Sequence, residues 1–445
     1  MRALYCLTIG VTLALSGWAC QSGEDRSSGA VTNIETVDPS NQKIVFWYQH
    51  TREREEELLA LVDEFNRTNS YGIEVQGEYA GRYDNIYNKM WVGLQGGTLP
   101  NLVVAYQNQA QAYYEAEGIV DLQLYMDSAK WGLSAEDKAD YFPAFLQQDN
   151  IDGVQICFPP NRSMEVFFYN MDWLKELGYV DQEGRATPPQ TWDQFAEMSR
   201  KAQTHPFSKA VNKDRTLGFI LEADASRLAS MVFSRGGDFI NAQRSAYTLN
   251  TPQVHSALGL MRQLVEEGAV DLLSEDYEDQ SEFAAGQVLF AMRSSSGLPF
   301  FETAVKSGVD FDWDVGAPPH SVDQPTVNVY GASLAICNTE PEKQLASWLF
   351  VKWFTEPQQQ ARWVTASNYF PVRRSTAAQL EDYFSTNPRY KQAFDLLEHG
   401  KSEPTLVGYE PVRRLIQKAV VRAIEGEPLD QLLGQLEQEA NAQLE

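Results

Sequence analysis

Between residues 43 and 105 the sequence alternates strand patterns with helix patterns, and this alternation restricts the fold more than any other feature. Three β-rich apolar runs follow one another, namely KIVFWYQH, GIEVQGEYAG and NLVVAYQ. The segment between the first two carries one apolar stripe at helical spacing, formed by Leu58, Leu61, Val62 and Phe65. Such alternation predicts a parallel sheet covered by helices. Because ligands of these sheets bind beyond the carboxyl ends of the strands, we expect a cleft beside residues 79–83 and 106–108.

The rest of the chain repeats the same kinds of element. VFFYN at 166–170 reads as a strand leading into a helix, and Thr191 with Gln194 has the spacing of a capping box. Apolar stripes return at 258–265 and 345–353, and from 411 the chain reads as helix, interrupted near 426–428. With 445 residues, of which 43% are hydrophobic, the chain can form more than one domain. The sequence predicts an α/β protein.

The N-terminus resembles an export signal. Arg2 precedes a mostly apolar run at 3–15 that is too short to span a bilayer, and SGWAC at 16–20 resembles a lipoprotein cleavage box. We predict a lipoprotein-type signal peptide over 1–20, with Cys20 as the lipidation site. An ordinary signal peptide with an incidental cysteine is the alternative. Residues 21–42 hold few bulky apolar side chains and are interpreted as a flexible tether.

Charge excludes some partners. The net charge of −25 argues against binding nucleic acid, since phosphate contacts require clustered Lys and Arg, and it also opposes docking on anionic lipid. An anionic ligand would need a local arginine or a set of backbone amides to override the global field. Cys157 and Cys337 lie in apolar stretches and are interpreted as buried hydrophobic side chains, with a bridge or a metal pair as the alternative.

Motifs for catalysis are mostly absent. The five histidines lack metal-ligand spacing, and the sequence has no Walker loop, dinucleotide glycine fingerprint or nucleophile elbow. Sixty-one acidic residues make chance carboxylate pairs inevitable, and runs such as EREEELL at 53–59 read as solvated helix faces. We therefore expect a binding protein without cofactor or metal. A secreted carbohydrate-active hydrolase using an acid pair is kept as the alternative.

Six stretches in a fixed order carry a family resemblance. They are VFWYQH with the helix that follows it to Asn66, GTLPN at 97–101, FYNMD at 168–172, PQTW at 189–192, FAAGQVLF at 283–290 and NYFPVR at 368–373. Together they resemble the extracellular solute-binding proteins of bacterial ABC importers. Within the carbohydrate group, the chain is most similar to the glycerol-3-phosphate and glycerophosphodiester binders.

The resemblance implies an α/β, two-lobed fold of the periplasmic-binding-protein type, with a hinge and an interlobe cleft. Lobe 1 would take residues 43–164 plus 334–375, and lobe 2 residues 165–333 plus 376–445. A polar ligand that bridges both lobes would stabilise the closed state, which the importer distinguishes from the open one. The implied partners are the permease subunits, with the chain a monomer anchored by its lipid in the periplasm or on the cell surface. A sensor that presents ligand to a receptor is a further alternative.

The resemblance also implies a set of ligand-binding residues. They are Tyr83, Gln107, Ser163, Ser296, Gly331, Tyr369 and Arg414. Arg414 matches an arginine that pairs with phosphate, where its rigid fork suits two oxygens. Structural roles (strand-end aromatic, turn, helix cap, hinge, solvated face) are the alternatives.

Two departures leave the ligand open. Gln107 stands where the family has a glutamate, and the region around residues 221–223 offers no stacking tryptophan. We therefore expect a sugar, a polyol or a glycerophosphoryl compound.

Overall fold

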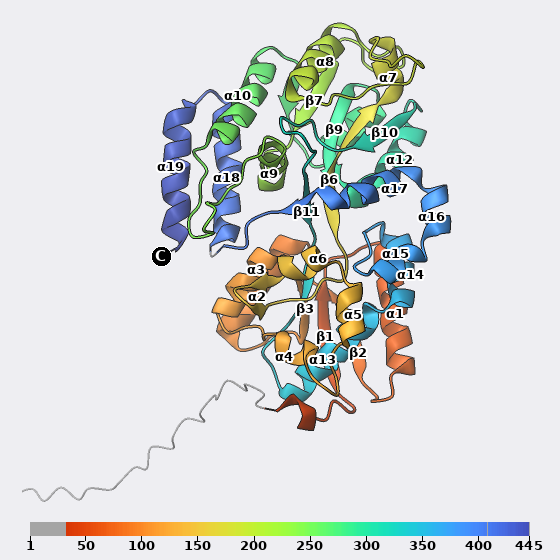
Figure 1. The fold of residues 1–445 in the computed structure, drawn as a ribbon, viewed down its shortest axis with the longest axis vertical. Coiled ribbons are helices and arrows are strands. Elements are labelled where there is room, and N and C mark those ends of the chain that lie inside the picture. Colours follow the sequence, from red (N-terminus) through yellow and green to blue (C-terminus); the bar gives the residue numbers. More distant parts are fainter. Residues whose placement is uncertain (1–32, 407, 445) are drawn as a thin grey trace, which may run out of the picture.

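Two sheets, each covered by helices, form the two lobes in the computed structural model, which describes residues 33–406 and 408–444 (Figure 1). The sheet of the first lobe, which is the lower one in Figure 1, has the order β12-β3-β1-β2. Its strands are β1 (Lys43–Tyr48), β2 (Glu74–Tyr79), β3 (Leu102–Ala105) and β12 (Ser333–Ile336). β1 runs parallel to both β2 and β3, which confirms the parallel sheet predicted for residues 43–105. β12 pairs antiparallel with β3.

Helices pack on both sides of this first sheet. They are α1 (Glu53–Thr68), α2 (Tyr83–Gly96), α3 (Gln107–Glu115), α4 (Gln123–Met126), α5 (Ala135–Asp140), α6 (Pro143–Gln148), α13 (Pro341–Phe354), α14 (Pro357–Ser367) and α15 (Arg374–Ala378). A short hairpin, β4 (Asn150–Ile151) with β5 (Val154–Gln155), completes this lobe. The four apolar residues predicted for one stripe of α1 are all buried.

The second lobe, which is the upper one in Figure 1, contains a seven-stranded sheet of order β13-β11-β6-β9-β7-β8, with β10 also paired to β6. Its strands are β6 (Ser163–Asn170), β7 (Leu217–Leu221), β8 (Val270–Leu272), β9 (Val288–Ser294), β10 (Trp313–Gly316), β11 (Val327–Tyr330) and β13 (Gly400–Ser402). β6 is antiparallel to its partners β9, β10 and β11, whereas β7 is parallel to β8 and β9. The chain thus forms the second sheet from segments far apart in sequence.

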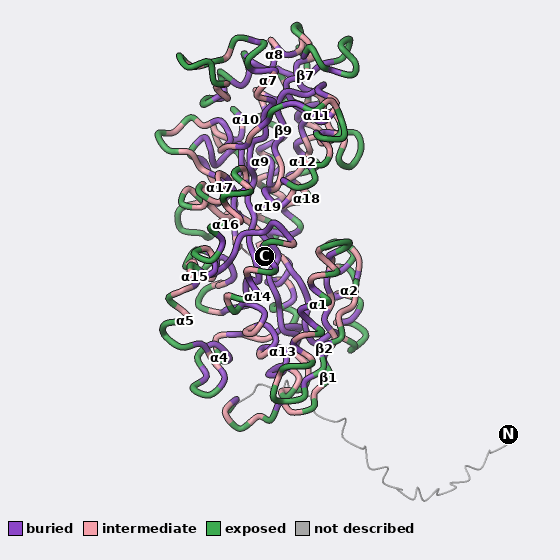
Figure 2. Tube along the Cα trace, turned by 90° about the vertical axis from the view of Figure 1, so that its right-hand side faces the viewer, coloured by how far each residue is buried: buried purple, intermediate pink, exposed green. Residues whose placement is uncertain are grey.

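The second sheet is covered by the remaining α-helices. They are α7 (Met171–Glu176), α8 (Trp192–Thr204), α9 (Ala225–Phe233), α10 (Pro252–Glu266), α11 (Glu278–Ala284), α12 (Leu298–Ser307), α16 (Glu381–Thr386), α17 (Pro388–Asp395), α18 (Tyr409–Ile424) and α19 (Leu429–Asn441). Short 3₁₀ turns are η1 (Ile34–Thr36), η2 (Ser295–Gly297), η3 (Leu396–His399) and η4 (Ala442–Leu444). The capping box at Thr191 and Gln194 is confirmed at the start of α8, as is the helix break before α19. Buried residues gather inside each lobe and exposed residues on the outer loops (Figure 2).

The folded body begins before the first strand, so the tether prediction is wrong for residues 33–42. Ile34 is buried, and its carbonyl oxygen accepts a hydrogen bond from the Trp131 indole at 3.2 Å. The Glu35 carboxylate accepts a hydrogen bond from the Ser128 hydroxyl at 2.8 Å. One isoleucine and one carboxylate thus fix a segment whose composition is otherwise that of a linker. Residues 1–32, which include Cys20, lie outside the described residues.

Arg162 joins the segments that pass between the lobes. Its backbone exchanges two hydrogen bonds with Phe370, and its guanidinium donates to the Ser333 hydroxyl at 3.0 Å and to the Asp149 carboxylate at 2.8 Å. The side chains of Arg162 and Asp149 are both wholly buried. Ser163 begins a strand of the second sheet and Ser333 a strand of the first, so two passages lie immediately before these residues. The lobe limits drawn from the resemblance stay a prediction.

Two further observations concern the described residues. None of the helices within 33–406 and 408–444 has the length and apolar character needed to cross a bilayer. Cys157 and Cys337 are buried free thiols, as the hydrophobic interpretation of these residues predicts.

Candidate functional site

The largest cavity that we describe lies between the two lobes and has a volume of about 640 Å³. From the first lobe it is lined by residues 49–54, which lead from β1 into α1, and by Tyr79, Arg82 and Tyr83, which join β2 to α2. β1 and β2 are parallel and end at the same edge of the sheet, so these loops lie together. The sequence predicts the cleft beside residues 79–83 and 106–108; the first of these segments contributes to the cavity lining and the second does not. The second lobe contributes residues of α11 and α12, and Tyr369 follows α14.

Three tyrosines gather on the first-lobe side of this cavity. The Tyr83 hydroxyl accepts a hydrogen bond from Gln49 Nε2 at 2.7 Å, and the rings of Tyr83 and Tyr106 lie 4.6 Å apart between centroids. Burial, and then the nearby Tyr369, raise the pKa of Tyr83 well above its usual value, and burial raises that of Tyr106. Both hydroxyls therefore stay neutral at physiological pH and can donate as well as accept hydrogen bonds.

Arg54 spans the cavity from α1 to the second lobe. Its Nη2 donates to the carbonyl oxygen of Ser296 at 2.7 Å. Its guanidinium carbon lies 5.2 Å from the ring centroid of Phe300 and 5.1 Å from that of Tyr369. Both are cation–π distances. Arg54 therefore touches both lobes and presents a cation to the space between them.

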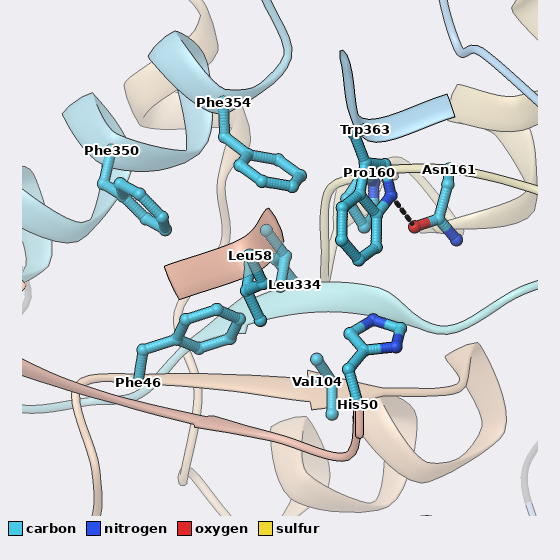
Figure 3. A pocket seen from close by; sticks show the side chains of 10 residues that line it. All are labelled: Phe46, His50, Leu58, Val104, Pro160, Asn161, Leu334, Phe350, Phe354 and Trp363. Carbon is cyan, nitrogen blue, oxygen red and sulfur yellow. Dashed lines mark hydrogen bonds between the residues drawn. The ribbon is translucent and has the colours of Figure 1, made fainter. Parts of the chain in front are cut away.

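His50 lines both this cavity and a small apolar one inside the first lobe, whose lining is shown in Figure 3. The smaller cavity has a volume of about 20 Å³, which is enough for a water molecule and far too small for a sugar. Beside it the His50 ring meets Trp363 edge-on at 4.9 Å, and the Trp363 indole donates to Asn161 Oδ1 at 2.8 Å. Burial, with a smaller effect from Arg54, lowers the pKa of His50 to about 3, so the imidazole is uncharged at neutral pH.

A charged network lies where α18 of the second lobe meets α3 of the first. Arg413 pairs with the buried carboxylate of Glu403, and its Nη2 lies 3.6 Å from Asp224 Oδ2. The Asn108 amide donates across the lobes to the Glu410 carboxylate. These groups hold the two lobes together on the side of the hinge where α3 and α18 meet.

Two of the sequence-predicted residues, Tyr83 and Tyr369, line the large cavity. Ser296 lies next to it, since its carbonyl oxygen accepts from Arg54 while its hydroxyl pairs with Ser294 at 3.0 Å. Arg414 lies elsewhere. Its side chain is 53% exposed, its Nη2 is 3.5 Å from Glu410 Oε1, and its guanidinium carbon lies 5.7 Å from the ring centroid of Tyr87.

The other three predicted residues do not line the large cavity. Gln107 begins α3 and is buried, and its Oε1 has no hydrogen-bond partner among the described residues. The Ser163 hydroxyl donates to the carbonyl oxygen of Tyr330 at 3.2 Å. Gly331 lies so close to the hinge that an added Cβ would meet Arg162 Cα at 3.2 Å. Ser163 and Gly331 thus lie beside the passages between the lobes, whereas Gln107 lies at the start of α3 with a buried, unpartnered amide oxygen.

A second, polar cavity of about 490 Å³ also lies between the lobes. Gln111, Gln147 and residues 150–152 line it from the first lobe, and residues 243–244 and 405–406 from the second. Arg244 donates to the Thr405 hydroxyl at 2.6 Å on its edge. Among the residues that we describe, no cluster of His, Cys, Asp and Glu has the arrangement of a metal site.

Comparison with known proteins shows what kind of molecule has this arrangement. The curated relatives include a probable ABC transporter-binding protein from Deinococcus radiodurans, 25% identical over 293 residues, or 63% of this chain. That match spans 66% of the relative, just under two thirds. The curated relatives also include the sn-glycerol-3-phosphate-binding periplasmic protein UgpB from Agrobacterium fabrum, which is 21% identical over 78% of each chain.

Solved structures share the two-lobed fold. One is UgpB from Mycobacterium tuberculosis in complex with glycerophosphocholine, at 21% identity and a TM-score of 0.76, covering 90% of this chain and 98% of that one. Another is the cyclic alpha-maltosyl-1,6-maltose binding protein from Arthrobacter globiformis, with the same identity and coverage and a TM-score of 0.74.

The model of one protein family matches residues 60–392, well over half of the chain. Its description is of solute-binding proteins rather than of enzymes, in agreement with the interlobe cavity. The chain belongs to the bacterial extracellular solute-binding protein family.

Proposed function

We propose that this chain is the substrate-binding subunit of an ABC importer and captures a sugar, a polyol or a glycerophosphoryl compound between its lobes. The observation that carries the proposal is the 640 Å³ cavity with walls from both lobes. A ligand in this space contacts both halves at once, so it stabilises the closed arrangement more than an open one. The importer would then distinguish the closed, ligand-bound state from the open one.

The cavity walls suit a ligand with both polar and apolar surfaces. Tyr83 and Tyr369 offer ring faces for sugar C–H surfaces, and the neutral Tyr83 hydroxyl can bind a ligand hydroxyl. We propose these two tyrosines as ligand contacts, with Ser296 beside them. Gln107, Ser163, Gly331 and Arg414 stay predictions from the resemblance.

We also propose export across the cytoplasmic membrane, with Cys20 as the lipid attachment site and the permease subunits of the importer as partners of the monomer. Support comes from the signal-like N-terminus and from family membership.

A thermal-shift screen of the full chain tests the proposal. The compounds are maltose, trehalose, sucrose, glycerol-3-phosphate and glycerophosphocholine. Because a ligand that binds only the folded state stabilises it by mass action, we expect about 2.7 kcal/mol at one hundred times its dissociation constant. Tyr83→Ala should remove most of the shift, whereas Tyr114→Ala, a change of a more exposed tyrosine on α3 outside the cavity lining, should retain it. Absence of a shift with every compound, or equal shifts in the two variants, would contradict the proposal.

A further inference from the structure

The charges around the large cavity have the opposite sign to those of the chain as a whole. Its lining contains three arginines, Arg52, Arg54 and Arg82, against one acid, Glu53, although the chain carries a net charge of −25. Arg82 pairs with Asp276 at 3.1 Å. Within the described part of the chain, neither Arg52 nor Arg54 forms an ion pair. Arg52 and Arg54 therefore present positive charge to the cavity without a carboxylate at ion-pair distance.

Arg54 is held in place with most of its donors unused. A guanidinium has five N–H donors, and the hydrogen bond to the Ser296 carbonyl takes one of them. The rings of Phe300 and Tyr369 lie close to its central carbon and limit its movement. A guanidinium fixed in this way presents a rigid fork that fits two oxygens of one carboxylate or phosphate.

Four arginines outside the cavity lining have carboxylate partners within the described structure. The pairs are Arg227 with Glu165, Arg293 with Asp279, Arg413 with Glu403, and Arg414 with Glu410. An incoming anion would have to compete with these carboxylates for their donors. It would meet no such competitor at Arg54.

We infer, on the basis of the proposed function, that the ligand of this cavity carries a carboxylate or phosphate group and that Arg54 binds this group. The rest of the ligand lies against the aromatic walls formed by Tyr83, Phe300 and Tyr369. A carboxylate and a phosphate both offer a pair of anionic oxygens, and in either case the remainder of the ligand presents C–H groups to the aromatic rings.

The test compares three probes built on one sugar ring, by isothermal titration of the full chain. Glucose is neutral, glucuronate carries a carboxylate and glucose 6-phosphate carries a phosphate. We expect at least one anionic probe to bind about tenfold or more tighter than glucose, as a charge-assisted hydrogen bond allows. The carboxylate and phosphate arms separate the two sources of charge. Affinity for the anionic probe should also fall as salt is raised.

Matched variants assign the effect to one residue. Arg54→Gln should lose about tenfold or more in affinity for the anionic probe and little for glucose. Arg54→Lys keeps the charge without the fork and should fall between the two. Arg200→Gln is the control, because Arg200 pairs with Glu267 at 2.6 Å and is not among the residues lining the cavity. Arg414→Gln is measured beside Arg54→Gln, because the resemblance assigns the anion to Arg414 instead.

Each contrary result has a distinct meaning. Glucose binding as tightly as both anionic probes would overturn the inference and leave the proposed function standing. So would a thermal shift with maltose when neither anionic probe binds. If Arg414→Gln lowers the affinity for the anionic probe and Arg54→Gln does not, Arg414 binds the anion and the role inferred for Arg54 is overturned. If neither the three probes nor the screened compounds bind, both the inference and the proposed function fail.

Discussion

His50 lines the large cavity and yet is almost wholly buried, because its ring packs edge-on against Trp363. Burial lowers its pKa to about 3, whereas a histidine in an unfolded chain titrates near 6.5. The unfolded state therefore takes up a proton at a higher pH than the folded state does. The contribution of the neutral ring to stability is complete above about pH 6.5 and is lost as the pH falls toward 3.

We predict that His50→Gln weakens the acid sensitivity of folding. Below about pH 6, the free energy of unfolding of the wild type should fall relative to that of the variant by about 1.4 kcal/mol for each pH unit. Urea denaturation at pH 7, 6, 5 and 4 measures the two slopes. His205→Gln, at an exposed position, is the control and should follow the wild type. If the free energies of unfolding of His50→Gln and wild type fall in parallel with pH, His50 takes up its proton at the same pH in the folded and unfolded states, which would contradict the lowered pKa.

At this scale the sequence predicts some site residues and conceals others. Tyr83 and Tyr369 were found through their resemblance to a known pattern, and Tyr83 also through its position after a strand. Arg54 lies in EREEELL, where the acids beside it make the segment read as a solvated helix face. Arg413 and Arg414 are neighbours on one helix turn, and no periodicity shows which of them faces the buried carboxylate of Glu403.

Helix α8 packs on strand β7 with almost no space at Gly218. A Cβ added there would lie 2.4 Å from Ser199 Cα, and no rotation of a side chain can relieve a contact with backbone. Gly218 thus sets the distance between a helix and a strand of the second sheet.

We predict that Gly218→Ala lowers the free energy of unfolding by about 1–3 kcal/mol, because α8 must move away from β7. Gly259→Ala is the matched control. It lies within α10, the nearest atom to its added Cβ is 3.8 Å away, and the change should raise stability by about 0.5–1 kcal/mol. Urea denaturation of both variants measures the difference. Equal stability of Gly218→Ala and wild type would mean that the two elements can separate freely.

Local patterns predict the long elements and fail for the short ones. Apolar periodicity predicts α1, α10, α13 and α18, and capping chemistry predicts the start of α8. Strand β13 has three residues and pairs in parallel with β11, far away in sequence, so no local signal indicates it. That β12 joins the first sheet, after the intervening second sheet, followed only from the family resemblance.

At the scale of the whole molecule, Arg162 links segments that lie where the chain passes between the lobes. Its guanidinium donates to Asp149 and to the Ser333 hydroxyl, and its backbone pairs with Phe370, so this one residue links segments that are far apart in the sequence. The pair with Asp149 is fully buried. Loss of one partner would leave the other charge buried without compensation.

We predict that Arg162→Met lowers the free energy of unfolding by about 3–5 kcal/mol, and that adding Asp149→Leu restores part of this loss. Arg185→Met is the control. Its pair with Asp181 is on the surface, with the arginine side chain 73% exposed, and is worth at most about 1 kcal/mol. Chemical denaturation of the four proteins gives the values. A double variant less stable than Arg162→Met would contradict the account of an uncompensated charge.

Strand β12 joins the first sheet although it lies more than 200 residues after β3 in the sequence, and this order affects folding during synthesis. As the chain leaves the ribosome, β1, β2 and β3 emerge early, but the edge strand at 333–336 and the covering helices α13 and α14 follow only after strands β6 to β11. For most of its synthesis the first lobe is therefore unfinished, with apolar surface open to chaperones or to aggregation. Any product truncated before residue 333 lacks the edge strand and the covering helices of its first sheet, so that sheet cannot be completed.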